Sequence, residues 1–448
     1  MASTYLTKDF SGASRQTWTW SCWFKRSKVS GTQTLFSSGT SNNDRSSIFI
    51  EDTTSTIRYY SSEGAAVAAW TASSAVLRDP SAWYHFVCKY GTTQATATDR
   101  IKFYLNGEAM VHQTGGITAY PAQNNASGYI GSNDTHGVGC LYYGTTATEY
   151  WDGYMAHVHF TDGTAYDASS FGETDSTTGI WKPKISPSVT YGTNGFFLKF
   201  ASSGSMGTDS SGNGNNFTVN GSITQTQDTP SNVFATWNPL DKDGVVTLTN
   251  GNTTFTSSAS GGSSNCNMGM YAGKWYFEVK HTVTNNAWVG IIPQNLYKFG
   301  SDLFTANYTA GTYAGNPNLY LNGSSQGSLG GGVTTNDIIM YAVDMDNNQI
   351  YIGKNGNWND GLAGGFDQSD FSNANAYSFN RYDDSYVVAG VNGSGSTGYT
   401  HHINFGNGYF GTTAVSTANS DANGYGLFEY SVPSGYYALC TKNIKEFG

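Results

Sequence analysis

The chain has 448 residues, of which 12% are charged and 15% are aromatic, and it contains 55 glycines. Its net charge of -10 and its lack of a basic run exclude nucleic acid as a partner, because phosphate binding needs clustered lysine or arginine. Abundant Ser, Thr, Asn, Gly and Tyr favour short strands and tight turns over helices, so we expect an all-β fold. The length allows two large domains or three smaller ones.

The five cysteines are scattered, odd in number and without C-x-x-C spacing. This pattern indicates neither a disulfide framework nor a zinc site, so we expect buried free thiols made in a reducing cytoplasm. No apolar run follows Met1, and no stretch reaches the ~20 apolar residues that a membrane helix requires. We therefore expect no signal peptide and no membrane insertion.

Aromatic strands are predicted in the first part of the chain. Residues 17–24 and 83–88 are rich in Trp, Tyr and Phe, which is typical of buried strands. Residues 101–105 alternate apolar and polar side chains and are followed by Asn106 and Gly107, the two-residue signal for a type I′ hairpin. Sequential antiparallel pairing is expected.

A further strand is predicted around two histidines. Its alternation places Ala156, Val158 and Phe160 together on the core face. His157 and His159 then lie on the opposite face, where they could supply two metal ligands, but a closed site needs four. We expect these histidines to face solvent or an interface instead.

The middle of the chain is predicted to connect two domains. Four of the nine prolines and a Gly/Asn-rich run lie between residues 182 and 241. The expected division is a first sandwich at residues 1–185, a connecting segment with one short strand at 186–241, and a second sandwich at 242–448.

Strands of the second sandwich follow the same rules. Residues 275–280 alternate and are predicted to be half-buried, whereas residues 338–343 are apolar on both faces and predict a central strand. Residues 350–354 lead into Asn355 and Gly356, a second hairpin signal. The expected fold class is therefore two antiparallel β-sandwiches of jelly-roll type in tandem.

Two families share motifs with the two halves. The first half resembles a laminin-G-like, concanavalin A-like jelly-roll domain, and the second half resembles a SPRY domain. The motifs of the first half are residues 18–26, 83–90, 101–108 and 151–162, and those of the second half are residues 273–279, 288–290, 344–356 and 402–406.

Further motifs are similar to those of structural proteins from tailed phages, notably marine ones, and this resemblance covers nearly the whole chain. It implies a virion protein made in the host cytoplasm, without indicating its part of the virion. Because the chain begins close to the first expected strand, without the heptads of long fibres, a compact knob, short fibre or head-decorating protein is favoured. The motifs are residues 171–173, 178–183, 191–217 and 437–443.

Catalytic motifs are incomplete. Glu173 and Asp175 resemble part of the E-x-D-x-x-E strand of laminarinase-type glycoside hydrolases, but the third acidic position holds Thr178. Residues 323–327 match a nucleophile-elbow string, which works only on a strand-to-helix turn, and a Gly/Ser loop is expected here. The protein is therefore not expected to be an enzyme.

Metal motifs are also incomplete. The loop that starts at Asp344 resembles the opening of an EF-hand but has Gln349 where Gly is needed, so we expect an Asx-rich turn. Calcium on a sandwich-rim loop remains an alternative, through Asn133, Asp134, Asp152 or Asp162, although turn stabilisation by these side chains is favoured. No cofactor and no metal ligand are predicted.

The aromatic surplus favours binding. Alternation cannot bury all of the 11 Trp, 31 Tyr and 24 Phe residues, and exposed rings offer flat apolar faces with a polar handle, suited to sugars or to partner subunits. The candidate ligand-binding residues are Tyr142, Tyr143, Tyr150 and Trp151. The alternative for this patch is cross-strand packing or a subunit contact.

The function expected from these observations is that of a phage virion surface protein. A tail fibre or receptor-binding protein that contacts host cell-surface polysaccharide ranks first, and a capsid decoration protein or structural knob ranks second. A secreted bacterial lectin or adhesin module is the third alternative. The expected partners are other virion proteins and further copies of the chain in a homo-oligomer.

Overall fold

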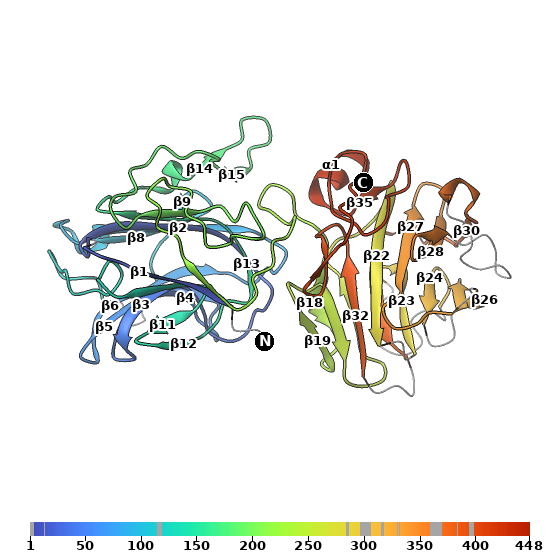
Figure 1. The fold of residues 1–448 in the computed structure, drawn as a ribbon, viewed down its shortest axis with the longest axis horizontal. Helices are drawn as coiled ribbons and strands as arrows, with labels where there is room; N and C mark the ends of the chain where they lie inside the picture. The colour runs from blue at the N-terminus through green and yellow to red at the C-terminus, as the bar shows by residue number, and fades with distance from the viewer. Residues whose placement is uncertain are drawn as a thin grey trace. The chain divides into compact units, whose positions relative to one another are not determined.

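The computed structural model describes residues 4–12, 14–113, 119–283, 286–295, 306–314, 318–328, 330, 332–358, 370–382, 384–393 and 398–448. Two compact units, Met1–Gln225 and Thr226–Gly448, divide the chain and are here called the N-terminal and C-terminal units. Both consist of strands in sheets that are almost entirely antiparallel, which confirms the predicted all-β fold (Figure 1).

The N-terminal unit is a sandwich of two sheets, which lie one above the other in Figure 1 and are here named the front sheet (lower) and the back sheet (upper). The front sheet has the order β17 (Thr218–Asn220), β1 (Tyr5–Asp9), β10 (Thr135–Val138), β3 (Gln33–Ser41), β4 (Asp44–Ile50), β5 (Thr56–Glu63) and β6 (Ala66–Val76). The back sheet has the order β16 (Phe196–Leu198), β13 (Gly153–Asp162), β2 (Thr17–Arg26), β7 (Tyr84–Gly91), β8 (Ile101–Leu105) and β9 (Glu108–Ala109).

Two hairpins and two short 3-10 helices complete the N-terminal unit. The hairpins are β11 (Leu141–Tyr143) with β12 (Thr146–Thr148), and β14 (Gly172–Thr174) with β15 (Trp181–Pro183). The 3-10 helices are η1 (Ala97–Asp99) and η2 (Ala168–Ser170).

Aromatic packing joins the two sheets of the N-terminal unit. The ring of Trp20 on β2 stacks on that of Phe36 on β3, with centroids 4.2 Å apart. Both side chains are fully buried, and burying an aromatic or aliphatic side chain of this size contributes about 1.5–3 kcal/mol. The predicted aromatic strand at residues 17–24 thus forms the centre of the core.

The predicted hairpin after β8 is confirmed. Asn106 and Gly107 have φ angles of 49° and 89°, and Leu105 pairs with Glu108 across the turn. A type I′ turn needs positive φ at both central residues, which Asn and Gly tolerate.

The expected faces of β13 are partly wrong. A β-bulge lies between Ala156 and His159, and His157 has a φ angle of 48°. Because a bulge inserts one extra residue, it reverses the side-chain alternation on one side of it. Ala156 therefore pairs with Trp23 away from the core, while Val158 remains in the core.

The expectation for the two histidines also needs correction. His159 is only 1% exposed and stacks on Phe197 with ring centroids 3.9 Å apart, and His157 is half-buried beside the same ring. They do not face solvent because residues near Tyr191 and Phe171 cover this side of the back sheet.

Residues 186–241, the expected connecting segment, contribute strands to both units. β16 pairs with β13, and β17 pairs with β1, inside the N-terminal unit. β18 (Trp237–Lys242) belongs to the C-terminal unit. The boundary between the two units lies between Gln225 and Thr226.

The C-terminal unit also has two main sheets. One has the order β18, β21 (Ser263–Cys266), β31 (Tyr386–Asn392), β23 (Ala287–Pro293), β24 (Ala310–Tyr313), β25 (Asn318–Leu321) and β26 (Ser324–Ser328). The other has the order β19 (Val246–Thr249), β20 (Thr254–Ser257), β32 (Tyr399–Asn404), β22 (Lys274–Val283), β27 (Ile338–Asp344), β28 (Gln349–Lys354) and β29 (Asn357–Trp358).

Short elements extend this second sheet or follow it. β30 (Tyr377–Ser378) pairs with β28, and β35 (Tyr437–Ala438) pairs in parallel with β22. The remaining elements are the hairpin of β33 (Tyr409–Phe410) and β34 (Thr413–Ala414), the 3-10 helix η4 (Phe371–Asn373) and the helix α1 (Thr441–Phe447).

The prediction of a central strand at residues 338–343 is confirmed. The prediction of a half-buried strand at residues 275–280 is wrong. β27 is buried along its whole length between β22 and β28. On β22, however, Tyr276 and Glu278 are as fully buried as Trp275 and Phe277 on the other face. The C-terminal segment that carries Phe428 covers this second face, an effect that local alternation does not reveal.

The cysteines fit the expectation of buried free thiols. All five are buried and none forms a disulfide. Within the residues that the structure describes, no helix is long and apolar enough to span a membrane.

Candidate functional site

The outer face of the front sheet carries half-exposed aromatic and basic side chains. Ile57 and Tyr59 of β5 point into the core, so the residues that alternate with them, Arg58 and Tyr60, point outward. Tyr60 pairs with Trp70 of β6, whose ring therefore lies on the same outer face.

These outward side chains form one continuous stripe, here called the aromatic stripe. The Tyr60 and Trp70 rings meet edge to face with centroids 5.4 Å apart. The guanidinium of Arg45 lies 5.4 Å from the Tyr60 centroid, and that of Arg58 lies 5.8 Å from the Trp70 centroid. Cation–π contacts of this kind hold both rings and both cations at the surface.

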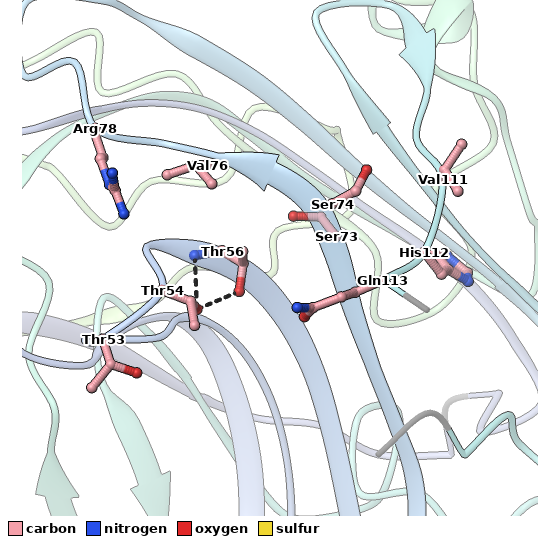
Figure 2. Close-up of a pocket in the computed structure, with 10 residues that line it drawn as sticks. All are labelled: Thr53, Thr54, Thr56, Ser73, Ser74, Val76, Arg78, Val111, His112 and Gln113. Atoms are coloured by element: carbon pink, nitrogen blue, oxygen red, sulfur yellow. Dashed lines mark hydrogen bonds between the residues drawn. The ribbon is translucent and has the colours of Figure 1, made fainter. Parts of the chain in front are cut away.

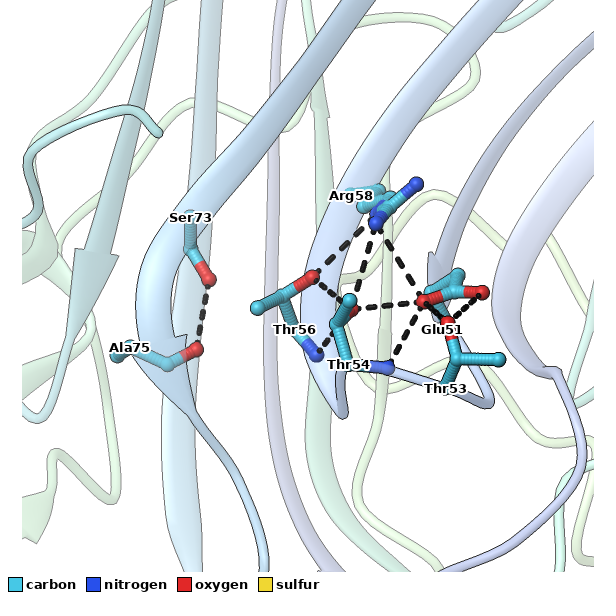
Figure 3. A network of polar contacts seen from close by, with 7 residues as sticks. All are labelled: Glu51, Thr53, Thr54, Thr56, Arg58, Ser73 and Ala75. Atoms are coloured by element: carbon cyan, nitrogen blue, oxygen red, sulfur yellow. Dashed lines mark hydrogen bonds and ion pairs between the residues drawn. The ribbon is translucent and has the colours of Figure 1, made fainter. Parts of the chain in front are cut away.

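A carboxylate fixes Arg58 at one end of the aromatic stripe. Glu51 accepts hydrogen bonds from the hydroxyls of Thr53 and Thr54 and forms an ion pair with Arg58 at 3.4 Å (Figure 3). Burial acts to raise the pKa of Glu51, but the bonds from Thr54 and Thr53 outweigh it and lower the pKa to about 2. Arg58 also donates to the hydroxyls of Thr54 and Thr56.

A pocket of about 460 Å³, here called the rim pocket, opens beside this network (Figure 2). Its wall includes a short segment that runs along the edge of β6, where Ser74 donates its N–H to the carbonyl of Val111 and Gln113 donates to Ala72. The lining residues are Thr53, Thr54, Thr56, Ser73, Ser74, Val76, Arg78, Val111, His112 and Gln113.

Part of the predicted tyrosine patch is assembled on the same sheet face. The ring of Tyr5, on β1, lies 6.2 Å from that of Tyr142 and 5.8 Å from that of Tyr150. Ser37 of β3 bonds to the Cys140 carbonyl and the Tyr142 N–H, so β11 crosses the outer face of the sheet.

The other two predicted ligand-binding residues lie differently. Tyr143 is half-buried on β11, at the turn of the hairpin opposite Thr146. Trp151 packs against the core, with its ring 5.4 Å from that of Phe24 at 83°. The structure therefore brings Tyr142 and Tyr150 together around Tyr5 and places Trp151 apart from them.

The carboxylates considered for catalysis hold a turn. Glu173 and Asp175, on the exposed hairpin of β14 and β15, both pair with Lys182, at 3.6 Å and 2.9 Å. The Lys182 ammonium and the N–H and hydroxyl of Thr178 lower the pKa of Asp175. The nucleophile-elbow string lies on the hairpin of β25 and β26, where no helix follows the strand among the described residues.

The loop after β27 is an Asx-rich turn, as predicted. The Asp344 carboxylate accepts from the backbone N–H of Asp346 and Asn347 and pairs with Lys274 at 2.9 Å. Its oxygens are therefore already bound by protein donors.

The rim residues considered for calcium also serve the backbone. Asp162 accepts from the N–H groups of Ser14 and Asn194, and Asn133 accepts from the N–H of Gly12. In the described part of the chain, no three His, Cys, Asp or Glu side chains gather as a metal site would need. The absence of a cofactor stays a prediction.

Comparisons with known proteins agree with the N-terminal architecture. A family model described as the concanavalin A-like lectin/glucanases superfamily, of the laminin G type, matches residues 2–168. This part of the chain is therefore similar in sequence to laminin-G-like, concanavalin A-like jelly-roll domains. A search of curated proteins finds no match.

Among solved structures, SPRY domains are similar to part of the chain. The SPRY domain of human HERC1 has 18% identity and a TM-score of 0.29, over 37% of this chain and 96% of that domain. The PSpry domain of TRIM65 has 12% identity and a TM-score of 0.28, over 38% of this chain and 91% of that domain. Stonustoxin has 10% identity and a TM-score of 0.27, over 38% of this chain and 27% of its own.

The aromatic stripe was missed by sequence reasoning. Arg58 and Tyr60 alternate with apolar residues, a signal of an outward face, but the sequence does not show which distant strand lies beside β5. Trp70 and Arg45 join the stripe only through the pairing of β6 and β4 with β5.

Proposed function

We propose that the protein is a surface protein of a tailed-phage virion and that it binds host cell-surface polysaccharide as a tail fibre or receptor-binding protein. The aromatic stripe is the observation that carries the binding part of this proposal. The virion location rests on the motifs shared with phage structural proteins, at residues 171–173, 178–183, 191–217 and 437–443.

The aromatic stripe suits a sugar polymer. Tyr60 and Trp70 are half-buried and so keep ring surface exposed, which can stack on the C–H face of a pyranose. Arg45 and Arg58 add hydrogen-bond donors beside the rings. The matched concanavalin A-like family includes lectins by name, which agrees with this assignment.

Binding of this kind is weak at a single site and gains from repetition. Several copies of the chain on one particle would raise the effective concentration of sites along a polysaccharide. The proposal therefore includes a homo-oligomer held to other virion proteins, and it requires neither a cofactor nor catalysis.

A capsid decoration or structural knob protein is the second candidate, and one surface feature favours it. The hairpin of β14 and β15 carries Ile180 with 63% of its surface exposed, and Ile185, 76% exposed, follows it. Exposed apolar side chains on one surface segment would suit a subunit contact.

Electron microscopy of intact particles labelled with antibody against this chain tests the location. Label at the tail tip supports the receptor-binding protein, label over the capsid supports the decoration protein, and absence of label from purified particles contradicts both. Binding of the full chain to an array of bacterial surface polysaccharides tests the ligand, and the lack of any retained polysaccharide contradicts glycan binding.

A further inference from the structure

The rim pocket has the size and lining of a sugar subsite. Its volume of about 460 Å³ lies within the ~300–1,000 Å³ of small-ligand sites. Thr53, Ser74 and Gln113 contribute groups that both donate and accept hydrogen bonds. Val76 and Val111, 47% and 70% exposed, add apolar contact surface at the same opening.

The pocket is continuous with the aromatic stripe. Arg58, which stacks over Trp70, donates at 3.3 Å to the hydroxyls of Thr54 and Thr56. Both threonines line the pocket (Figure 2). A polymer that lies on the stripe would therefore reach the pocket with its next sugar units.

The charge that lines the pocket is positive. Arg78 is exposed, lines the opening and has no ion-pair partner among the described residues. The nearby Glu51 carboxylate is already bound by four donors, and Asp79 accepts from the N–H of Ser81. Arg78 is therefore available to an anionic ligand, and its planar fork matches a carboxylate.

His112 forms part of the pocket wall. Its Nδ1 bonds with the hydroxyl of Tyr120, whereas its Nε2 is buried without a hydrogen-bond partner in the described part of the chain. Burial lowers the pKa of His112, so the ring is neutral at pH 7. The ring meets that of the core residue Phe103 edge to face, with centroids 5.1 Å apart, so Arg78 is the one charged side chain among the residues that line the pocket.

We infer that the rim pocket binds a sugar unit that carries a carboxylate, with Arg78 as its ion-pair partner. This inference rests on the proposed glycan binding and names its substrate class. The shared chemistry is that of a sugar acid, which a polysaccharide can present either as a hexuronic acid or as a sialic acid.

The test compares acidic oligosaccharides with their carboxyl-reduced neutral analogues on an array, using the full chain. We expect the wild-type chain to bind the acidic members at least tenfold more tightly, and R78Q to lose this preference while it retains the neutral ones. K445Q, which removes an exposed cation from the C-terminal unit, is the matched control and should behave as wild type.

Each outcome decides the matter. Equal binding of acidic and reduced glycans by the wild-type chain overturns the inference and leaves the proposed function standing, whereas no binding of any glycan overturns the proposed function itself. A preference that survives in R78Q also overturns the inference.

Ser74→Trp, which fills the pocket from an exposed position, should abolish binding of the acidic oligosaccharides even if R78Q folds poorly. Separate hexuronic and sialic acid arms identify the source of the carboxylate.

Discussion

The indole nitrogen of Trp181 donates a 2.9 Å hydrogen bond to Nδ1 of His85. His85 is fully buried on β7, and its Nε2 lies 2.9 Å from the hydroxyl of Ser21. Because Nδ1 accepts a hydrogen bond from the indole, Nε2 must carry the proton of the neutral ring and donate a hydrogen bond to the Ser21 hydroxyl. The bond from Trp181 thus attaches the exposed hairpin of β14 and β15 to the back sheet.

Gly172 makes this attachment testable. A Cβ at this position would overlap the Trp181 indole, although its backbone conformation is open to any residue. Gly172→Ala should therefore displace Trp181 from His85 and lower the free energy of unfolding by about 1–3 kcal/mol. Gly204→Ala, where a Cβ meets no atom within 4 Å, is the control and should unfold as wild type in chemical denaturation. Equal unfolding of the two variants would contradict the role given to Trp181.

Buried histidines predict acid sensitivity. All eight have a pKa below the usual 6.5 because burial disfavours the charged ring, and for His85 and His136 it falls to about 3. Between the lowered pKa and 6.5 the unfolded chain binds more protons than the folded chain, so the unfolding free energy rises with pH across this window. The stabilisation is complete above pH 6.5 and is lost as the pH falls toward 3.

Calorimetry of the full chain from pH 8 to pH 4 measures this effect. The unfolding temperature should stay nearly constant above pH 7 and decline progressively below pH 6.5. The N-terminal unit holds five of the eight histidines and should show the steeper decline. An unfolding temperature that is flat between pH 7 and pH 4 would show that these rings are accessible to protons in the folded chain.

Local features were predictable from the sequence, and features that depend on distant contacts were not. The Asn106 and Gly107 turn was predicted because its requirement for positive φ lies within two residues. The bulge at His157 was not predictable, because the rule of alternating side chains assumes an unbroken ladder of hydrogen bonds between strands. For the same reason the sequence indicated that Tyr142 could be exposed, but not that Tyr5 lies beside it, since their strands meet only in the folded sheet.

The aromatic stripe predicts which ring removal weakens glycan binding. Trp70→Ala removes the indole ring of the stripe and the support of Arg58, so affinity for a bound polysaccharide should fall at least about fivefold. Tyr271→Ala, which removes a ring that is 56% exposed in the C-terminal unit, is the control. Tyr142→Ala in the same binding assay separates the tyrosine patch from the stripe. A loss in Tyr142→Ala without a loss in Trp70→Ala would assign binding to the patch instead.

Glu278 in the C-terminal unit predicts a pH dependence of opposite sign. Burial raises the pKa of Glu278 from 4.5 to about 7, although hydrogen bonds from the N–H groups of Tyr430 and Glu429 act to lower it. The folded chain therefore binds the proton more tightly than the unfolded chain, so this contribution to stability is complete below pH 4.5 and is lost as the pH rises to about 7.

Glu278→Gln removes that dependence and isolates it from the histidines, which both chains share. The destabilisation of the variant relative to wild type should be largest near pH 4.5 and should shrink by roughly 3 kcal/mol by pH 7.5, the free energy that corresponds to the pKa change. Denaturant unfolding at several pH values measures it, with amide exchange of residues 427–430 to localise the effect. Glu446→Gln, at an exposed position on α1, should show a constant difference. A constant difference for Glu278→Gln as well would mean that the pKa of Glu278 is the same in the folded and unfolded chains, because the hydrogen-bond donors then offset burial.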